Sequence, residues 1–131
     1  MLDSWALLAY VFNQPGADKV EKYLARAETG TCRLLMSWIN AGECVYMTTR
    51  KKGAHAAAEL ERALTGSLPI ELVLPEVEHI LGAARIKAAA KVAYADAFAL
   101  DLARRHDAPV ITGDPEIRNY GEVGVVWVGV G

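Results

Sequence analysis

The segment spanning residues 94–116 constrains the fold more strongly than any other part of this sequence. Its first half places apolar residues at helical spacing, which predicts an amphipathic helix packed on a core. Its second half contains a short β-branched run at 109–112, bounded by proline and glycine, which is typical of a buried parallel strand. Asp114 follows that strand, and Asp96 lies on the flank of the helix's apolar face. Because ligands bind at the carboxyl ends of strands in open α/β sheets, both carboxylates are expected to face one crevice.

Helical and strand-like segments alternate along the rest of the chain. Further strands are predicted near residues 1–3, 34–36, 68–74 and 123–130. Helices are predicted near residues 5–12, 20–29, 38–52, 54–64 and 75–88. The first strand is only a stub. This alternation predicts an α/β fold, in which a parallel sheet carries helices on both faces within a single domain spanning residues 1–131.

Local signals place several helix starts. Ser4 and Ser37 are predicted N-caps of the first and third helices, and Pro75 suits the first position of a later one. That later helix has an apolar face made of Val77, Ile80, Leu81, Ala84 and Ala88.

The composition is that of a globular protein, since 53% of the residues are hydrophobic. No apolar run approaches the roughly 20 residues of a membrane span, and the N-terminus lacks a basic region leading into an apolar signal core. We therefore expect a soluble, cytoplasmic protein. The net charge of −2 gives no general attraction to nucleic acid, so RNA binding would require local basic patches or metal ions.

Other reactive residues form no catalytic pattern. Cys32 and Cys44 are expected to be buried free thiols, and the three histidines to be solvated surface residues. The basic run at residues 50–52 ends the third helix, where it suits the helix dipole or, alternatively, RNA phosphates.

Four acidic residues stand out by their positions: Asp3, Glu43, Asp96 and Asp114. Three of them also have ordinary structural explanations. Asp3 and Asp114 each precede a predicted helix, so both are good N-caps, and Asp96 gains from the dipole near a helix start.

Glu43 is harder to explain structurally. It shares a helical stripe with Met36, Ile39, Tyr46 and Met47, which is predicted to face the interior. An unpaired buried carboxylate costs several kcal/mol, so Glu43 is expected to have a metal ion or another polar partner.

Converging carboxylates would repel one another unless a cation neutralised them. Oxygen ligands select Mg²⁺ or Mn²⁺, and several carboxylates around an open site suit phosphodiester hydrolysis. Thr112 is placed to contact the metal-bound water or Asp114, although it also reads as an ordinary β-branched strand residue. Asp101 lies about 140° around the helix from Asp96 and is expected to be structural.

Four motifs together resemble the PIN-domain ribonucleases, and most closely the VapC toxins of bacterial toxin–antitoxin pairs. They are Leu2-Asp3-Ser4 with the following Leu-Leu-Ala-Tyr, Asn40-Ala-Gly-Glu43, Ala95-Asp96-Ala-Phe-Ala-Leu, and Thr112-Gly-Asp114-Pro-Glu. The likeness spans nearly the whole chain, and the acidic quartet of that family matches Asp3, Glu43, Asp96 and Asp114, with Thr112 as a supporting hydroxyl. One departure is that only two residues precede Asp3, where the family has most of a strand, so the true start of the protein is expected to lie upstream or the strand to be short.

The resemblance implies a three-layer α/β/α sandwich with a central parallel sheet. It also implies a Mg²⁺- or Mn²⁺-dependent endoribonuclease that forms a homodimer and is inhibited by a small cognate antitoxin protein. Two alternatives remain open at this point. One is a phosphohydrolase of small phosphate esters, and the other is a non-catalytic module of the same fold that binds RNA or a protein partner.

Overall fold

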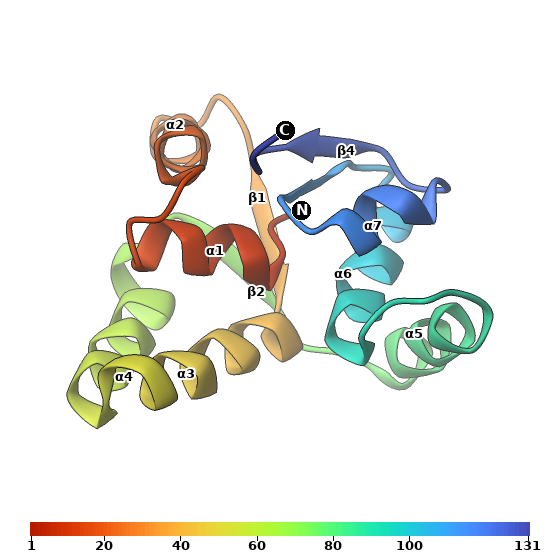
Figure 1. Ribbon diagram of the computed structural model, residues 1–131, viewed down its shortest axis with the longest axis horizontal. Helices are drawn as coiled ribbons and strands as arrows, with labels where there is room; N and C mark the ends of the chain where they lie inside the picture. The colour runs from red at the N-terminus through yellow and green to blue at the C-terminus, as the bar shows by residue number, and fades with distance from the viewer.

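The computed structural model describes all residues from 1 to 131, and helices and strands alternate along it (Figure 1). The strands are β1 (Leu34–Ser37), β2 (Ile70–Val73), β3 (Val110–Thr112) and β4 (Val125–Trp127). The α-helices are α1 (Ser4–Val11), α2 (Ala17–Glu28), α3 (Trp38–Lys52), α4 (Ala54–Arg62), α5 (Val77–Ala89), α6 (Tyr94–Arg105) and α7 (Pro115–Tyr120). A short π-helical segment, η1 (Ala63–Ser67), continues α4.

Residues 1–3 form the centre of the sheet. The other strands make two parallel pairs, β1 with β2 and β3 with β4. On one side, the N–H of Leu2 donates to the carbonyl of Leu35 at 2.8 Å. On the other side, the N–H of Ile111 donates to the carbonyl of Met1 at 2.7 Å. The predicted strand stub is therefore confirmed, and it joins the two pairs into one parallel arrangement.

Successive residues of the central strands pack on opposite faces of the sheet. In β1, Leu34 and Met36 belong to a core cluster shared with α1, α2, α3 and α4. Leu35 between them belongs to a second cluster shared with α5, α6 and α7. Figure 1 shows α1 and α2 on one side of β1, and α5, α6 and α7 on the other. The fold is therefore the expected α/β three-layer sandwich with parallel strands.

Three helices begin where the central strands end. α1 follows residues 1–3 directly, α3 follows β1, and α7 follows β3 after two residues. Their N-caps are Asp3, Ser37 and Asp114, and each side chain accepts a hydrogen bond from a backbone N–H of the first turn. The carboxyl edge of the sheet thus gathers three helix N-termini, whose dipoles favour negative charge.

Two predictions about helix starts, Ser4 as the cap of the first helix and Pro75 as the first residue of a later one, are wrong. Asp3 rather than Ser4 caps α1, because the Asp3 carboxylate reaches the N–H of Ala6. Pro75 precedes α5, which begins at Val77 with Glu76 as its N-cap.

The apolar face predicted for α5 faces solvent. The residues of α5 that pack inward are Gly82, Ala83 and Ile86. Val77 and Leu81 remain 72% and 50% exposed. Small side chains set the inward face, because they allow α5 to lie close against α6.

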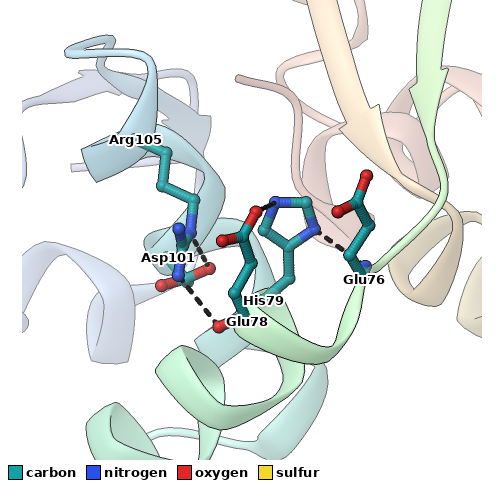
Figure 2. A network of polar contacts seen from close by, with 5 residues as sticks. All are labelled: Glu76, Glu78, His79, Asp101 and Arg105. Atoms are coloured by element: carbon teal, nitrogen blue, oxygen red, sulfur yellow. Dashed lines mark hydrogen bonds and ion pairs between the residues drawn. The ribbon is translucent and has the colours of Figure 1, made fainter.

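Figure 2 shows the polar contacts that fix the crossing of α5 and α6. The Asp101 carboxylate is buried and accepts from Nε of Arg105 at 2.7 Å. Arg105 also donates to the backbone carbonyl of Glu78 at 2.9 Å. The Nδ1 of His79 accepts from the N–H of Glu76 at 3.0 Å, completing the N-terminal cap of α5. Asp101 therefore has the expected structural role.

The remaining expectations on single residues hold in part. Cys32 and Cys44 are both free; Cys44 is fully buried as predicted, whereas Cys32 is only half-buried. His55 and His106 are exposed, whereas the side chain of His79 is only 16% exposed because it serves the α5 cap. None of the helices combines the length and hydrophobicity that a bilayer crossing requires.

Candidate active site

Asp3 is fully buried at the carboxyl edge of the sheet. One carboxylate oxygen accepts from the N–H of Ala6 at 2.9 Å, and the other accepts from the hydroxyl of Thr112. Burial raises the pKa of Asp3 to about 7, although the hydrogen bonds from Thr112 and Ala6 oppose the change. The negative charges of Asp96 and Asp114 raise it further. Asp3 is thus both a helix cap and a member of an acidic group.

Thr112 connects Asp3 with Asp114. While its hydroxyl donates to Asp3, it accepts from the backbone N–H of Asp114 at 2.9 Å. Thr112 is fully buried at the end of β3. The predicted contact with Asp114 therefore exists, but it is made to the backbone and not to the carboxylate.

Asp96 and Asp114 face each other across the same edge. Asp96 lies in the first turn of α6 and is 8% exposed. Its pKa is raised to about 7, first by burial and then by the charges of Asp114 and Glu43. Asp114 is half-buried and caps α7 through the N–H of Glu116 at 2.9 Å. Its capping role does not prevent Asp114 from taking part in the acidic group, because the same Asp114 carboxylate raises the pKa of Asp96.

Glu43 approaches the group from α3, on a different face from the predicted one. The buried face of α3 consists of Asn40, Ala41, Cys44 and Thr48. Ile39 and Tyr46, predicted to share an interior stripe with Glu43, are 36% and 47% exposed. Glu43 is half-buried, and its carboxylate accepts from the Tyr46 hydroxyl at 3.4 Å. The interior argument for Glu43 is therefore wrong, but its charge does act on Asp96.

The four acids have no cationic partner within the chain. The ion pairs of the structure involve Arg33, His55, His79 and Arg105, and none of these reaches Asp3, Glu43, Asp96 or Asp114. Near neutral pH, therefore, either the buried acids Asp3 and Asp96 carry protons or a cation from solution must balance their charge.

The chemistry of this donor set fits a hard divalent cation. Carboxylate oxygens are the ligands that Mg²⁺ and Mn²⁺ prefer, and a cation would relieve the repulsion among them. No three acidic side chains lie close enough together to enclose one ion by themselves. This also suits Mg²⁺, which commonly keeps several waters and takes only one or two carboxylates from the protein.

A buried amide holds the supporting helices together. Nδ2 of Asn40 donates to the Ser4 hydroxyl at 3.2 Å and to the Ala95 carbonyl at 2.9 Å. Asn40 thereby links α3 to the residues next to Asp3 and Asp96. The sequence analysis named Asn40 only as part of a motif and predicted no role for it. Its position one helical turn before Glu43 is the signal that could have assigned it a positioning role.

Comparison with known proteins gives one family match. The PIN domain family model matches residues 1–123 of this chain. A search of curated proteins finds no match.

Several solved structures share the fold. VapC20 of Mycobacterium tuberculosis, a toxin that cleaves the sarcin–ricin loop, is 13% identical with a TM-score of 0.73, covering 92% of this chain and 93% of that one. A toxin–antitoxin complex from Klebsiella pneumoniae is 16% identical with a TM-score of 0.71, covering 98% of both chains. FitAcB from Neisseria gonorrhoeae is 17% identical with a TM-score of 0.69, covering 97% and 96%. At these identities the likeness establishes a common fold.

Proposed function

Because this chain belongs to the PIN domain family, we propose that it is a metal-dependent endoribonuclease that hydrolyses RNA phosphodiester bonds. The observation that carries the proposal is the acidic group at the carboxyl edge of the sheet. Asp3 and Asp96 there have pKa values of about 7, each raised partly by the charge of Asp114. Carboxylates without a protein cation partner suit Mg²⁺ or Mn²⁺ and a phosphate substrate.

Each acid has a proposed role. Asp3, Asp96 and Asp114 would hold the cation, with one or two of them as direct ligands and the others acting through its bound waters. Glu43 shares this ligation or orients the attacking water. Thr112 keeps the Asp3 carboxylate in place through the hydroxyl it donates. When bound, the divalent ion would lower the pKa of a water and stabilise charge on the phosphate.

Cleavage of a mixed-sequence single-stranded RNA tests this proposal. We expect cutting with Mn²⁺, none with EDTA, and loss of at least 100-fold in rate for Asp96→Asn. Asp18→Asn is the matched control, because Asp18 is an exposed aspartate in the first turn of α2 and is not among the charges that shift the pKa of Asp3 or Asp96. Unchanged cleavage by Asp96→Asn would refute the site, and hydrolysis of generic phosphate esters in place of RNA would redirect the assignment to a small-molecule phosphohydrolase.

We further propose that the enzyme is the toxin of a toxin–antitoxin pair acting in the cytoplasm. Two of the similar structures support this, since one is a toxin–antitoxin complex and another is a toxin. A groove of about 620 Å³ offers a docking place for an antitoxin segment. It is lined by α1, α3, α4 and η1 residues including Val11, Phe12, Ala56, Leu60 and Ala63.

Co-expression with a candidate antitoxin tests the pairing. We expect the two proteins to purify together and RNA cleavage to be suppressed. Ala56→Glu would place a charge in the groove and should release the partner, whereas free toxin activity should remain. Persistence of the complex with Ala56→Glu would exclude the groove as the docking place.

The exposed apolar face of α5 supports a homodimer. Leu74, Val77, Ile80 and Leu81 are 73%, 72%, 42% and 50% exposed. Acidic residues lie at the start of α5 and basic ones toward its end, so antiparallel pairing of two copies would bring opposite charges together.

Light scattering after size exclusion tests the dimer. Leu81→Glu should convert the dimer to a monomer. Val130→Glu is the control, because Val130 is a 79% exposed apolar residue outside this face. A wild-type protein that stays monomeric at the highest concentration measured would contradict the proposal.

A further inference from the structure

An arginine stacked on a tryptophan lies beside the acidic edge. The guanidinium of Arg118 is 3.9 Å from the centre of the Trp127 ring. Arg118 is on α7 and Trp127 is at the end of β4, two elements that lie next to each other in Figure 1. Neither residue belongs to the motifs that identified the acids.

Both members are tied directly to the acidic group. The N–H of Arg118 donates to the carbonyl of Asp114 at 3.2 Å, so the two residues are one helical turn apart. Trp127 is the register partner of Thr112 in the β3–β4 ladder. In a parallel ladder, partner side chains point to the same face, so Trp127 lies on the face where Thr112 contacts Asp3.

Arg118 has no carboxylate partner of its own. It is exposed, and the arginines that form ion pairs are Arg33 and Arg105. Stacking on Trp127 occupies one face of its guanidinium and restricts its rotamers. The N–H donors in the guanidinium plane and its outer face are left free, which suits a phosphate or a base on that side.

The position of Trp127 is not explained by its own hydrogen bonding. Its indole Nε1 is buried without a partner, which is an unfavourable state for a polar group. A Cβ at Gly129 would lie 2.7 Å from the ring, so the neighbouring chain leaves room for the indole by carrying glycine there. The ring is thus fitted closely in place under Arg118.

An acidic edge repels the polyanion that the proposed reaction requires. Four carboxylates lie at this edge, and the net charge of the chain is −2, so attraction of RNA needs a local cation. Arg118 lies one helical turn after Asp114 and pairs with no carboxylate. It can therefore attract RNA to this edge without neutralising one of the acids.

We propose that Arg118, held by Trp127, is a binding site for a phosphate of single-stranded RNA adjacent to the cleaved bond. This inference rests on the proposed nuclease function. Its chemistry is a charge-assisted hydrogen bond from the guanidinium edge to phosphate oxygens. Trp127 acts as a positioning residue that keeps the guanidinium facing the strand.

RNA binding without cleavage tests the site. A fluorescein-labelled single-stranded RNA of mixed sequence is titrated with the Asp96→Asn protein in Mg²⁺, and anisotropy is followed at several salt concentrations. Adding Arg118→Gln should weaken binding about 10-fold and reduce the slope of log affinity against log salt by about 0.7. Arg118→Lys should keep the slope, because it keeps the charge, while losing part of the affinity.

Two further variants make the result specific. Arg26→Gln is the matched control, since Arg26 is exposed and lies 5.3 Å from the Tyr23 ring on α2. It should leave both affinity and slope unchanged. Trp127→Phe should raise KM for RNA in the cleavage-competent protein while changing kcat less than twofold. If Arg118→Gln disturbs folding, the KM values of Arg118→Lys and Trp127→Phe for RNA still test the site.

The outcomes separate the site from the function it rests on. Binding by Arg118→Gln equal to that of Arg26→Gln, in a protein whose wild type cuts RNA, would overturn the Arg118 site and leave the nuclease proposal standing. A wild type that neither binds nor cuts RNA would overturn both.

Discussion

Protonation of Asp3 and Asp96 links the acidic site to stability. Both have folded-state pKa values of about 7, against an ordinary value of 3.8. Between these values the folded protein holds protons that the unfolded chain has released. The free energy of unfolding therefore falls as pH rises from about 4 to about 7, and it stays low above that range.

Asp96→Asn should stabilise the metal-free protein. It removes a charge that burial and Asp114 disfavour. In EDTA at pH 8, we expect the Tm to rise by about 4 °C for each kcal/mol gained, and the fall in stability between pH 5 and pH 8 to become shallower.

Asp101→Asn provides the opposite control on the same helix. Asp101 is also buried, but Arg105 pairs with it at 2.7 Å. Its loss should lower the Tm. A lower Tm for Asp96→Asn at pH 8 would contradict the repulsion argument.

Thr112→Val tests the hydroxyl that joins Asp3 and Asp114. Valine keeps the shape but leaves the N–H of Asp114 without its acceptor and Oδ2 of Asp3 without its donor. We expect a loss of about 1–3 kcal/mol in stability and a 10- to 100-fold drop in RNA cleavage. Thr112→Ser keeps the hydroxyl and should retain most activity. Equal activities of the two variants would show that the hydroxyl is dispensable.

At the scale of elements, the crossing of α5 and α6 depends on a single glycine. A Cβ at Gly82 would overlap the carboxylate of Asp101 and lie 2.8 Å from its Cγ. Gly82→Ala should therefore destabilise the protein by about 1–3 kcal/mol, even though alanine is the better helix former.

Gly42→Ala is the matched control for that variant. Gly42 is also inside a helix, and a Cβ there would meet nothing within 4 Å. It should stabilise the protein by about 0.5–1 kcal/mol. Chemical denaturation of both variants measures the change in the free energy of unfolding, which should be negative for Gly82→Ala and positive for Gly42→Ala. A stabilising Gly82→Ala would mean that the crossing of α5 and α6 can relax to accept a methyl group.

Secondary structure was largely predictable because periodicity is a local property. The third helix was predicted over residues 38–52, and α3 spans Trp38–Lys52. Strand lengths were overestimated: β4 covers only residues 125–127 of the predicted 123–130. Which face of a helix is buried depends on its neighbours, so the apolar face of α5 and the stripe of Glu43 were misassigned.

The acids were found by position, since strand ends and helix starts can be read from the chain. Their mutual influence on pKa depends on distances that no local pattern contains. The stacking of Arg118 on Trp127 was not predictable for the same reason, because it joins α7 to β4 across a turn.

At the scale of the whole molecule, divalent cations should stabilise the fold. A site filled at 100 times its dissociation constant adds about 2.7 kcal/mol. We expect millimolar Mn²⁺ to raise the Tm of the wild type at pH 8, and this rise to be reduced in Asp3→Asn. The exposed Asp18→Asn should respond like the wild type. No response of the wild type would favour a non-catalytic module.

The central position of residues 1–3 also sets when this protein can become active during its synthesis. Asp3 and its partner Thr112 are 109 positions apart, so Asp3 is synthesised well before Thr112 and waits for it. At roughly 5–20 residues per second, this wait is on the order of 5–20 s. A nascent chain therefore carries Asp3 without Asp114, and the complete acidic edge forms only after residues 112–114 have been made. Within this interval, a partner that binds the earlier helices can reach the chain before any nuclease exists.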